Sequence, residues 1–183
     1  MQTYISILRG INVSGQKKIN MQELKAMYES YGFGNVATYI QSGNVVFQSE
    51  KEEEKLLAKK IEDAIKATFG FDVPVLVLTL KDIMATIKHN PFLKEKDIQT
   101  DKLHVTFLQD KPEAANIKKT EELDFSPDRF VISGKDVYVY CPNGYGNTKI
   151  NNNFFESKLK VKATTRNWKT VNELERIAEG LAD

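Results

Sequence analysis

The sequence predicts an α+β protein that contains two βαββαβ units in tandem. Short apolar runs of strand length alternate with segments whose apolar residues recur at helical spacing. A Ser-Gly pair separates two strand-like runs in each half, at 42–43 and at 133–134. The polar stretch 94–101 lies between the halves. We therefore expect a first unit over residues 1–80, a connecting helix and linker over 81–101, and a second unit with a final helix over 102–183.

In the first half, isoleucine- and valine-rich runs predict four strands. These runs are 4–8, 36–41, 44–48 and 73–78. Asn20 followed by Glu23 predicts the start of one helix, and Ser49 followed by Glu52 predicts the start of a second helix that ends at Gly70.

The same order recurs in the second half, after a connecting helix that Thr79 caps and that ends before Pro91. The predicted strands are 103–108, 129–132, 137–141 and 161–165. One helix follows Pro112, another contains Phe154 and Phe155, and Thr170 with Glu173 predicts the cap of the final helix. This order suits two ferredoxin-like (alpha-beta plait) subdomains with additional helices, each a four-stranded antiparallel sheet backed by helices. One larger mixed sheet is the alternative.

The composition is that of a globular protein, with 41% hydrophobic and 28% charged residues among 183. Cys141 is the single cysteine, so no disulfide can form within the chain, and the two histidines lie far apart in sequence. We therefore expect no metal and no cofactor. The apolar runs are too short for a signal peptide or a membrane span, so we expect a cytoplasmic protein with no membrane partner.

The charge is unevenly distributed. The chain carries +1 overall, which argues against a protein that coats DNA. Residues 147–170, however, carry six lysines and arginines against Glu156 alone, a local charge of +5. Such a run is either a solvated face or a surface for an anion.

Three loops contain the residue types that bind anions. In the first, after the first strand, glycines lie among Arg9, Asn12 and Lys17, and glycine allows backbone amides to approach an anion closely. The loop lacks the GxGxxG and P-loop spacings, so a plain connecting loop is the alternative.

The second loop follows the strand 137–141 and contains two glycines around Tyr145, then Asn147 and Lys149. Lys149 is suited to an oxyanion. The third segment ends the last strand and contains Arg166, Asn167 and Trp168. A guanidinium beside an indole suits a phosphate with a base, although Trp168 as a core residue and Arg166 as the partner of an acid explain the pattern equally well.

Four other residues are weaker candidates. Tyr138 and Tyr140 share one face of a strand, where RNA-recognition domains stack bases, but the RNP1 pattern is absent and core or interface packing is the simpler interpretation. His104 lies inside an apolar strand and is interpreted as a core histidine. Cys141 has no evident histidine partner for nucleophilic catalysis.

Four ordered blocks resemble a known family. They are 7–15 (ILRGINVSG), 38–47 (TYIQSGNVVF), 144–149 (GYGNTK) and 163–168 (ATTRNW). These blocks resemble the signatures of the bacterial family of domain of unknown function 1697, and the resemblance covers nearly the whole chain. Ser14 stands where that family often has glycine. The resemblance implies two ferredoxin-like subdomains, a structural duplication, but it implies no established activity and supplies no catalytic residues.

These observations leave three functional hypotheses. The first is a binding module for a phosphate-bearing ligand, a nucleotide or single-stranded nucleic acid, in which Arg9, Lys149 and Arg166 converge on one cleft. The second is an enzyme that uses Lys149 or Tyr145 on a small phosphorylated or carboxylated metabolite. The third is a protein-interaction module that uses its sheet faces, for which a homodimer burying Tyr138 and Tyr140 would be evidence.

Overall fold

A computed structural model describes residues 1–182, and the chain forms two units within it. Unit 1 comprises Met1–Ala85 together with residues 173–182, and unit 2 comprises Thr86–Asn172. The divisions therefore fall inside two helices, α3 (Leu80–Lys88) and α6 (Trp168–Ala182). Each unit has one four-stranded antiparallel sheet, which excludes the single larger mixed sheet.

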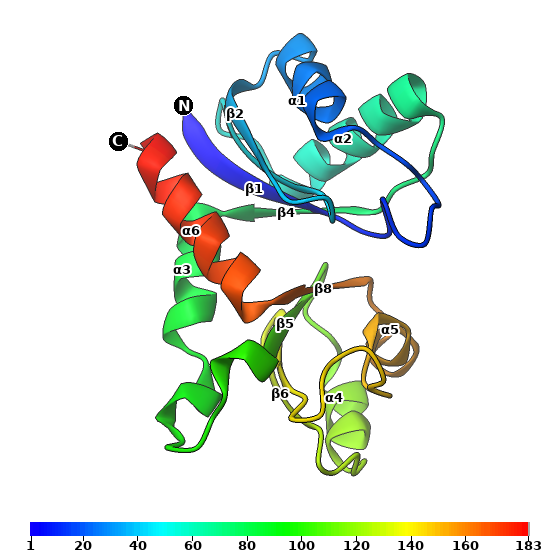
Figure 1. Ribbon diagram of the computed structural model, residues 1–183, viewed down its shortest axis with the longest axis vertical. Helices are drawn as coiled ribbons and strands as arrows, with labels where there is room; N and C mark the ends of the chain where they lie inside the picture. The colour runs from blue at the N-terminus through cyan, green and yellow to red at the C-terminus, as the bar shows by residue number, and fades with distance from the viewer. Residues whose placement is uncertain (183) are drawn as a thin grey trace. The chain divides into compact units, whose positions relative to one another are not determined.

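Unit 1 has the order β1–α1–β2–β3–α2–β4. Its elements are β1 (Gln2–Leu8), α1 (Met21–Ser30), β2 (Gly34–Tyr39), β3 (Asn44–Ser49), α2 (Glu54–Phe69) and β4 (Val75–Thr79). The strand order across the sheet is β2-β3-β1-β4. Helices α1 and α2 cover one face of this sheet, and the last turns of α6 lie on the other (Figure 1), where the Gln48 side chain donates to the Leu181 carbonyl at 2.6 Å.

The core of unit 1 lies between the sheet and helices α1 and α2. Tyr4 from β1, Phe47 from β3 and Tyr28 from α1 are fully buried there, and Phe47 stacks on Tyr4 with 5.7 Å between ring centroids. The buried hydroxyls of Ser6 and Tyr28 form a hydrogen bond with each other at 2.7 Å. Burial of these large rings contributes to the free energy that holds the helices on the sheet.

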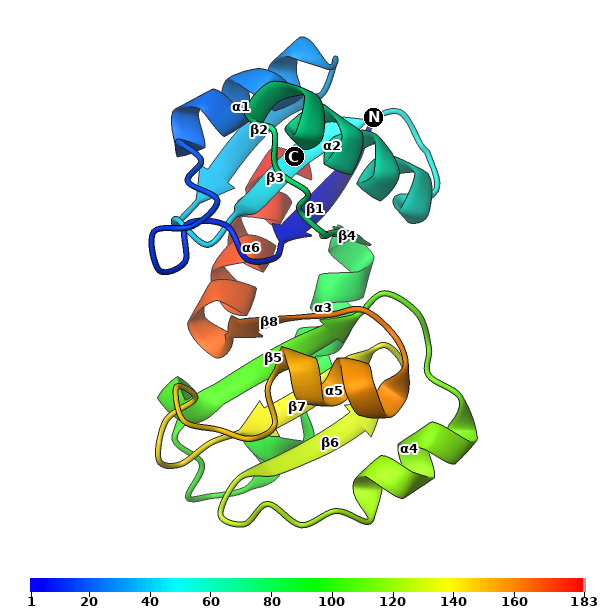
Figure 2. The same cartoon turned by 90° about the vertical axis from the view of Figure 1, so that its right-hand side faces the viewer.

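Unit 2 repeats this order with β5–α4–β6–β7–α5–β8. Its elements are β5 (Leu103–Leu108), α4 (Ala114–Glu121), β6 (Arg129–Ser133), β7 (Asp136–Tyr140), α5 (Asn152–Leu159) and β8 (Ala163–Asn167). The strand order is β6-β7-β5-β8, and Figure 2 shows α4 and α5 on the same face of this sheet. Two short 3-10 helices, Pro91–Lys94 and Thr100–Lys102, precede β5.

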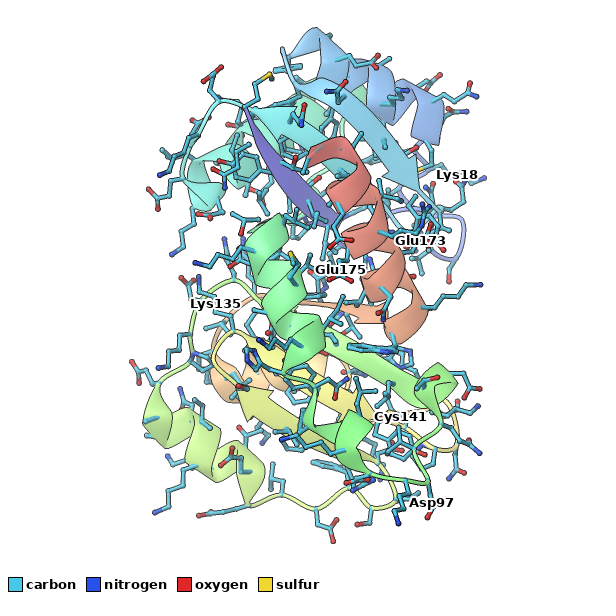
Figure 3. All side chains as sticks on the ribbon, turned by 90° about the vertical axis from the view of Figure 1, so that its left-hand side faces the viewer. Lys18, Asp97, Lys135, Cys141, Glu173 and Glu175 are labelled. Carbon is cyan, nitrogen blue, oxygen red and sulfur yellow. The ribbon has the colours of Figure 1, made fainter. Side chains whose placement is uncertain are left out.

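Most predicted elements are confirmed, with ends displaced by a few residues. Asn20 caps α1 through its side-chain oxygen, which accepts from the backbone N–H groups of Gln22 and Glu23, and Gly70 ends α2 with a positive φ of 80°. Thr79 caps α3 by accepting from the Asp82 N–H at 3.1 Å. The predicted hairpin at 133–134 is the β6–β7 turn, where Gly134 has a φ of 60°. Lys135, labelled in Figure 3, completes that turn.

Two predicted caps are wrong. Ser49 does not cap α2, because it is still paired with Gln2 in the sheet, and the helix begins at Glu54. Thr170 does not cap the final helix, because α6 begins two residues earlier at Trp168. The cap is Asn167, whose side-chain oxygen accepts from the Thr170 N–H at 2.8 Å.

No helix in residues 1–182 is long and apolar enough to cross a membrane.

Candidate functional site

The glycine loop after β7 lies on the helix-covered face of the unit 2 sheet. Tyr145 from this loop stacks on His104 of β5, with 4.5 Å between ring centroids and 24° between the ring planes. Asn167 is the cross-strand partner of His104 on β8. Tyr145, His104 and Asn167 therefore come together at one end of the sheet, from three segments of the chain.

The exposed polar groups of this region are available to a ligand. The side chains of Asn147 and Lys149 are exposed and make no hydrogen bond or ion pair within residues 1–182. Asn167 uses its side-chain oxygen to cap α6, which leaves the two hydrogens of its Nδ2 atom as donors. Asn167 is thus the strand neighbour of His104, and Asn147 and Lys149 follow Tyr145 two and four residues later in the same loop.

Hydrogen bonds stabilise the loop itself. The Thr148 hydroxyl donates to the Asp128 carboxylate at 2.7 Å, and the Thr148 N–H donates to the Tyr145 carbonyl at 3.1 Å. Gly144 takes a φ of 94°, which allows its N–H to close a turn on the Cys141 carbonyl. Tyr145 is therefore positioned by the loop backbone as well as by its contact with His104.

Burial favours the neutral form of His104. It lowers the pKa of the imidazole below its ordinary value of 6.5, although the Lys102 backbone partly opposes the shift. The Nδ1 atom is buried and has no hydrogen-bond partner in the described part of the chain. The structure corrects the expectation of a core histidine, because the His104 ring is only partly buried and its Nδ1 atom is unsatisfied.

Arg166 and Trp168 do not join this group. Side chains alternate along a strand, so Arg166 points to the sheet face opposite Asn167 and lies beside Val105. Arg166 is 9% exposed, and burial lowers the pKa of its guanidinium to about 10. Trp168 opens α6 and is 8% exposed. Both residues are packed in the protein interior.

The predicted residues of unit 1 organise their own loop. Asn12 has a φ of 54°, and its Nδ2 atom donates to the carbonyls of Ile19 at 3.0 Å and Gln41 at 2.9 Å. Its Oδ1 atom accepts from the Ile19 N–H at 2.8 Å. The Lys17 ammonium donates to the Asp72 carbonyl at 2.6 Å. The side chains of Asn12 and Lys17 thus stabilise the loop, whereas Arg9 lies half-buried at its start.

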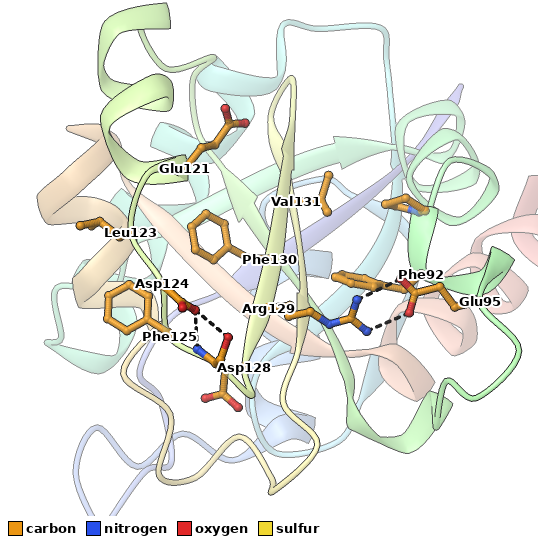
Figure 4. A pocket seen from close by; sticks show the side chains of 12 residues that line it. Phe92, Glu95, Glu121, Leu123, Asp124, Phe125, Asp128, Arg129, Phe130 and Val131 are labelled. Carbon is orange, nitrogen blue, oxygen red and sulfur yellow. Dashed lines mark hydrogen bonds and ion pairs between the residues drawn. The ribbon is translucent and has the colours of Figure 1, made fainter.

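Sequence patterns did not indicate a cavity of about 320 Å³ beside β6 (Figure 4). It is lined by Pro91, Phe92, Glu95, Glu121, Leu123, Asp124, Phe125, Ser126, Asp128, Arg129, Phe130 and Val131. None of the nine predicted residues contributes to it. The one signal in the sequence is a cluster of phenylalanines at 125 and 130 among acidic residues, which is also typical of a surface loop above a core.

No group of three or more His, Cys, Asp or Glu side chains among the described residues is arranged to hold a metal ion. The thiol of Cys141, labelled in Figure 3, is buried at the end of β7. Its burial raises the pKa of the thiol, although a hydrogen bond to Thr148 partly opposes the shift.

Comparison with known proteins gives a family and a fold. Residues 1–138 match the model of a family described as a protein of unknown function, DUF1697. The solved structure of a conserved bacterial protein from Streptococcus pneumoniae is similar, with a TM-score of 0.73 and 23% sequence identity. The match covers 97% of this chain and 98% of that one. No curated protein matches the sequence significantly.

Proposed function

Because this chain belongs to the DUF1697 family of proteins of unknown function, we propose a function from its own geometry: it binds a phosphate-bearing ligand, a nucleotide or single-stranded nucleic acid, at the glycine loop of unit 2. The proposed site consists of Tyr145 on His104, the neighbouring Asn167, and Asn147 and Lys149 from the same loop as Tyr145. Asn12 and Lys17 are left out of the binding site because their side chains hold the loop of unit 1, and Arg166 and Trp168 are left out because they are buried.

The stack of Tyr145 on His104 is the observation that carries this proposal. Aromatic side chains that remain partly exposed at the end of a sheet offer a surface on which a base can stack. Burial favours the neutral form of His104, so the positive charge of the site comes from Lys149. A neutral ring pair beside one ammonium and two amides suits a ligand with a flat ring and a phosphate.

Binding is favoured over catalysis by the exposure of Lys149. A lysine that acts as an acid or base is usually desolvated, because burial brings its pKa toward neutrality. Lys149 is exposed and does not line the cavity beside β6. The enzyme hypothesis therefore has less support than binding.

The structure does not support an interaction surface at Tyr138 and Tyr140. Tyr138 and Tyr140 are 1% and 8% exposed, the Tyr138 hydroxyl donates to the Thr86 carbonyl at 2.8 Å, and Tyr140 packs on Phe92. These tyrosines are occupied within unit 2.

We also propose that each unit is a ferredoxin-like subdomain and that the protein works in the cytoplasm. The βαββαβ order and the strand order β2-β3-β1-β4, repeated as β6-β7-β5-β8, support the first proposal. The single, buried cysteine is compatible with a reducing compartment.

Calorimetric titration with ATP and with a short single-stranded RNA, each at low and high salt, tests the function. We expect saturable binding that Lys149→Ala weakens about tenfold, and a steep salt dependence if the ligand is nucleic acid. Lys158→Ala is the matched control, because Lys158 is another exposed lysine of the same unit. Equal losses in both variants would indicate general charge attraction and contradict a site at Tyr145.

A further inference from the structure

The outer edge of β6 is unpaired. β6 is the edge strand of the unit 2 sheet, and its pairing with β7 is the only ladder it makes within residues 1–182. No other backbone hydrogen bond in the described chain reaches Arg129–Ser133. Natural edge strands are commonly protected by proline, charged side chains or a bulge. β6, with the sequence Arg-Phe-Val-Ile-Ser, has no proline and pairs with β7 in regular register, and its one charged side chain, Arg129, is paired with Glu95.

The β6–β7 hairpin determines which backbone groups face outward. Its two-residue turn, Gly134 and Lys135, makes Ser133 and Asp136 a hydrogen-bonded pair. Hydrogen-bonded and non-hydrogen-bonded pairs then alternate along the ladder. The N–H and C=O groups of Phe130 and Ile132 therefore point away from β7, and they form a row to which another strand can pair.

The cavity beside β6 extends over both faces of this edge. Phe130 lies on one face with Leu123 and Phe125, and Val131 and Arg129 lie on the other with Phe92 (Figure 4). Leu123 and Val131 are each 39% exposed, which is high for large apolar side chains. An added strand places its side chains alternately on the two faces, so this cavity would receive both sets.

The rim of the cavity is acidic. Four carboxylates line it, and Arg129 is its one basic residue. Arg129 is already engaged, because it forms two hydrogen bonds to Glu95 at 3.0 and 2.8 Å and lies over the rings of Phe92 and Tyr140. Glu121, Asp124 and Asp128 have no basic partner among residues 1–182. Hydrogen bonds from Ser126 also lower the pKa of Asp124, which keeps that carboxylate ionised.

We propose that the outer edge of β6 binds an extended peptide segment in which basic and apolar residues alternate. The peptide pairs with the outward N–H and C=O groups of Phe130 and Ile132 and becomes a fifth strand of the sheet. Its basic side chains lie along Phe125 and bring their charges to Glu121 and Asp124, and its apolar side chains cover Val131. The charge of the rim selects a basic partner, and the unpaired edge selects an extended one.

Fluorescence anisotropy with the full-length protein and a labelled short peptide that alternates lysine and valine tests the proposal. We expect saturable binding, and binding at least about tenfold weaker for the peptide in which glutamate replaces lysine. Two further peptides carry N-methyl groups, one on every lysine amide and the other on every valine amide. An added strand that pairs with β6 in one fixed direction uses only one of its two edges, so one of these peptides should lose binding and the other should keep it.

Val131→Lys places a positive charge in the cavity beside β6 and should weaken peptide binding about tenfold. The matched control is Val13→Lys, which makes the same change at another exposed valine, in unit 1. Amide NMR spectra should show that both variants keep the fold of the original protein. In the original protein, peptide binding should slow hydrogen exchange at the amides of Phe130 and Ile132.

Three results would overturn the proposal. Equal binding of both N-methylated peptides would mean that side chains alone capture the peptide. Full competition by spermidine, a flexible polyamine without a peptide backbone, would assign the cavity to small cations. A dimer in solution that Val131→Lys converts to a monomer would assign the edge to a second copy of this chain.

Discussion

Asn12 and Gln41 are joined by a hydrogen bond of 2.9 Å from the side-chain amide of Asn12 to the carbonyl of Gln41, although 29 residues separate them. This contact ties the loop after β1 to the β2–β3 hairpin. Gly43 of the same hairpin packs on Leu8 and Ile11, and its carbonyl accepts from the Leu8 N–H at 2.8 Å. The first two blocks that resemble family signatures therefore meet in space, and their shared role in this chain is to build one end of unit 1.

Asn12→Asp should destabilise the protein by about 2–4 kcal/mol, because the substitution places a carboxylate oxygen against the carbonyls of Ile19 and Gln41 in place of a donor. Urea unfolding measures the change. Asn147→Asp is the control, and since Asn147 is exposed we expect a change within about 0.5 kcal/mol. Equal effects of the two substitutions would contradict the role of Asn12 as the link between the loops.

Gly43→Ala should destabilise unit 1 by about 2–4 kcal/mol, since a Cβ atom would add steric overlap to an unfavourable backbone conformation. That Cβ would lie 2.7 Å from Ile11 Cδ1 and 2.8 Å from Leu8 Cβ, and Gly43 has a φ of 90°. Gly10→Ala separates the two causes, because Gly10 also has a positive φ, 76°, but has no atom within 4 Å of such a Cβ. We expect Gly10→Ala to lower the free energy of unfolding by about 1 kcal/mol, measured by thermal or urea unfolding.

The stability of the protein should fall as the pH drops below 6.5, in part through His104. Its folded-state pKa is lowered, so the unfolded chain binds more protons between the folded-state pKa and the ordinary value of 6.5. The contribution of His104 is therefore present above 6.5 and is lost at lower pH. His104→Gln should flatten the curve of unfolding free energy against pH in this range. His89→Gln, at an exposed histidine, is the control, and an unaltered curve in His104→Gln would disprove the assignment.

Cys141 should be unreactive toward Ellman's reagent in the folded protein. Its thiol is fully buried and its pKa is raised by burial, so both access and the thiolate population are low. Reaction should become complete in urea, which provides the internal control. Rapid reaction of the native protein would mean that the end of β7 opens readily, and it would restore Cys141 as a candidate nucleophile.

Local patterns in the sequence predict most of the secondary structure. Apolar runs bounded by turn residues predicted the eight strands of the described chain, and helical spacing together with helix-start residues predicted its six α-helices. The predicted caps at Ser49 and Thr170 are wrong. Ser49 is still paired with Gln2 in the sheet, and Asn167, the last residue of β8, caps α6 in place of Thr170. Helix starts depend on where the preceding strand stops pairing, and that is a tertiary property.

Only the tertiary structure sorted the predicted site residues. Nothing in the sequence around Arg166 and Asn167 distinguishes them as ligands, yet alternation along β8 places Arg166 in the interior and Asn167 beside His104. The stack of His104 on Tyr145 and the acidic cavity beside β6 are each formed by segments that are distant in sequence. Local patterns in the sequence indicate which side of each element is buried. A binding surface forms where several elements end together, and the pairing of the strands decides which ends meet.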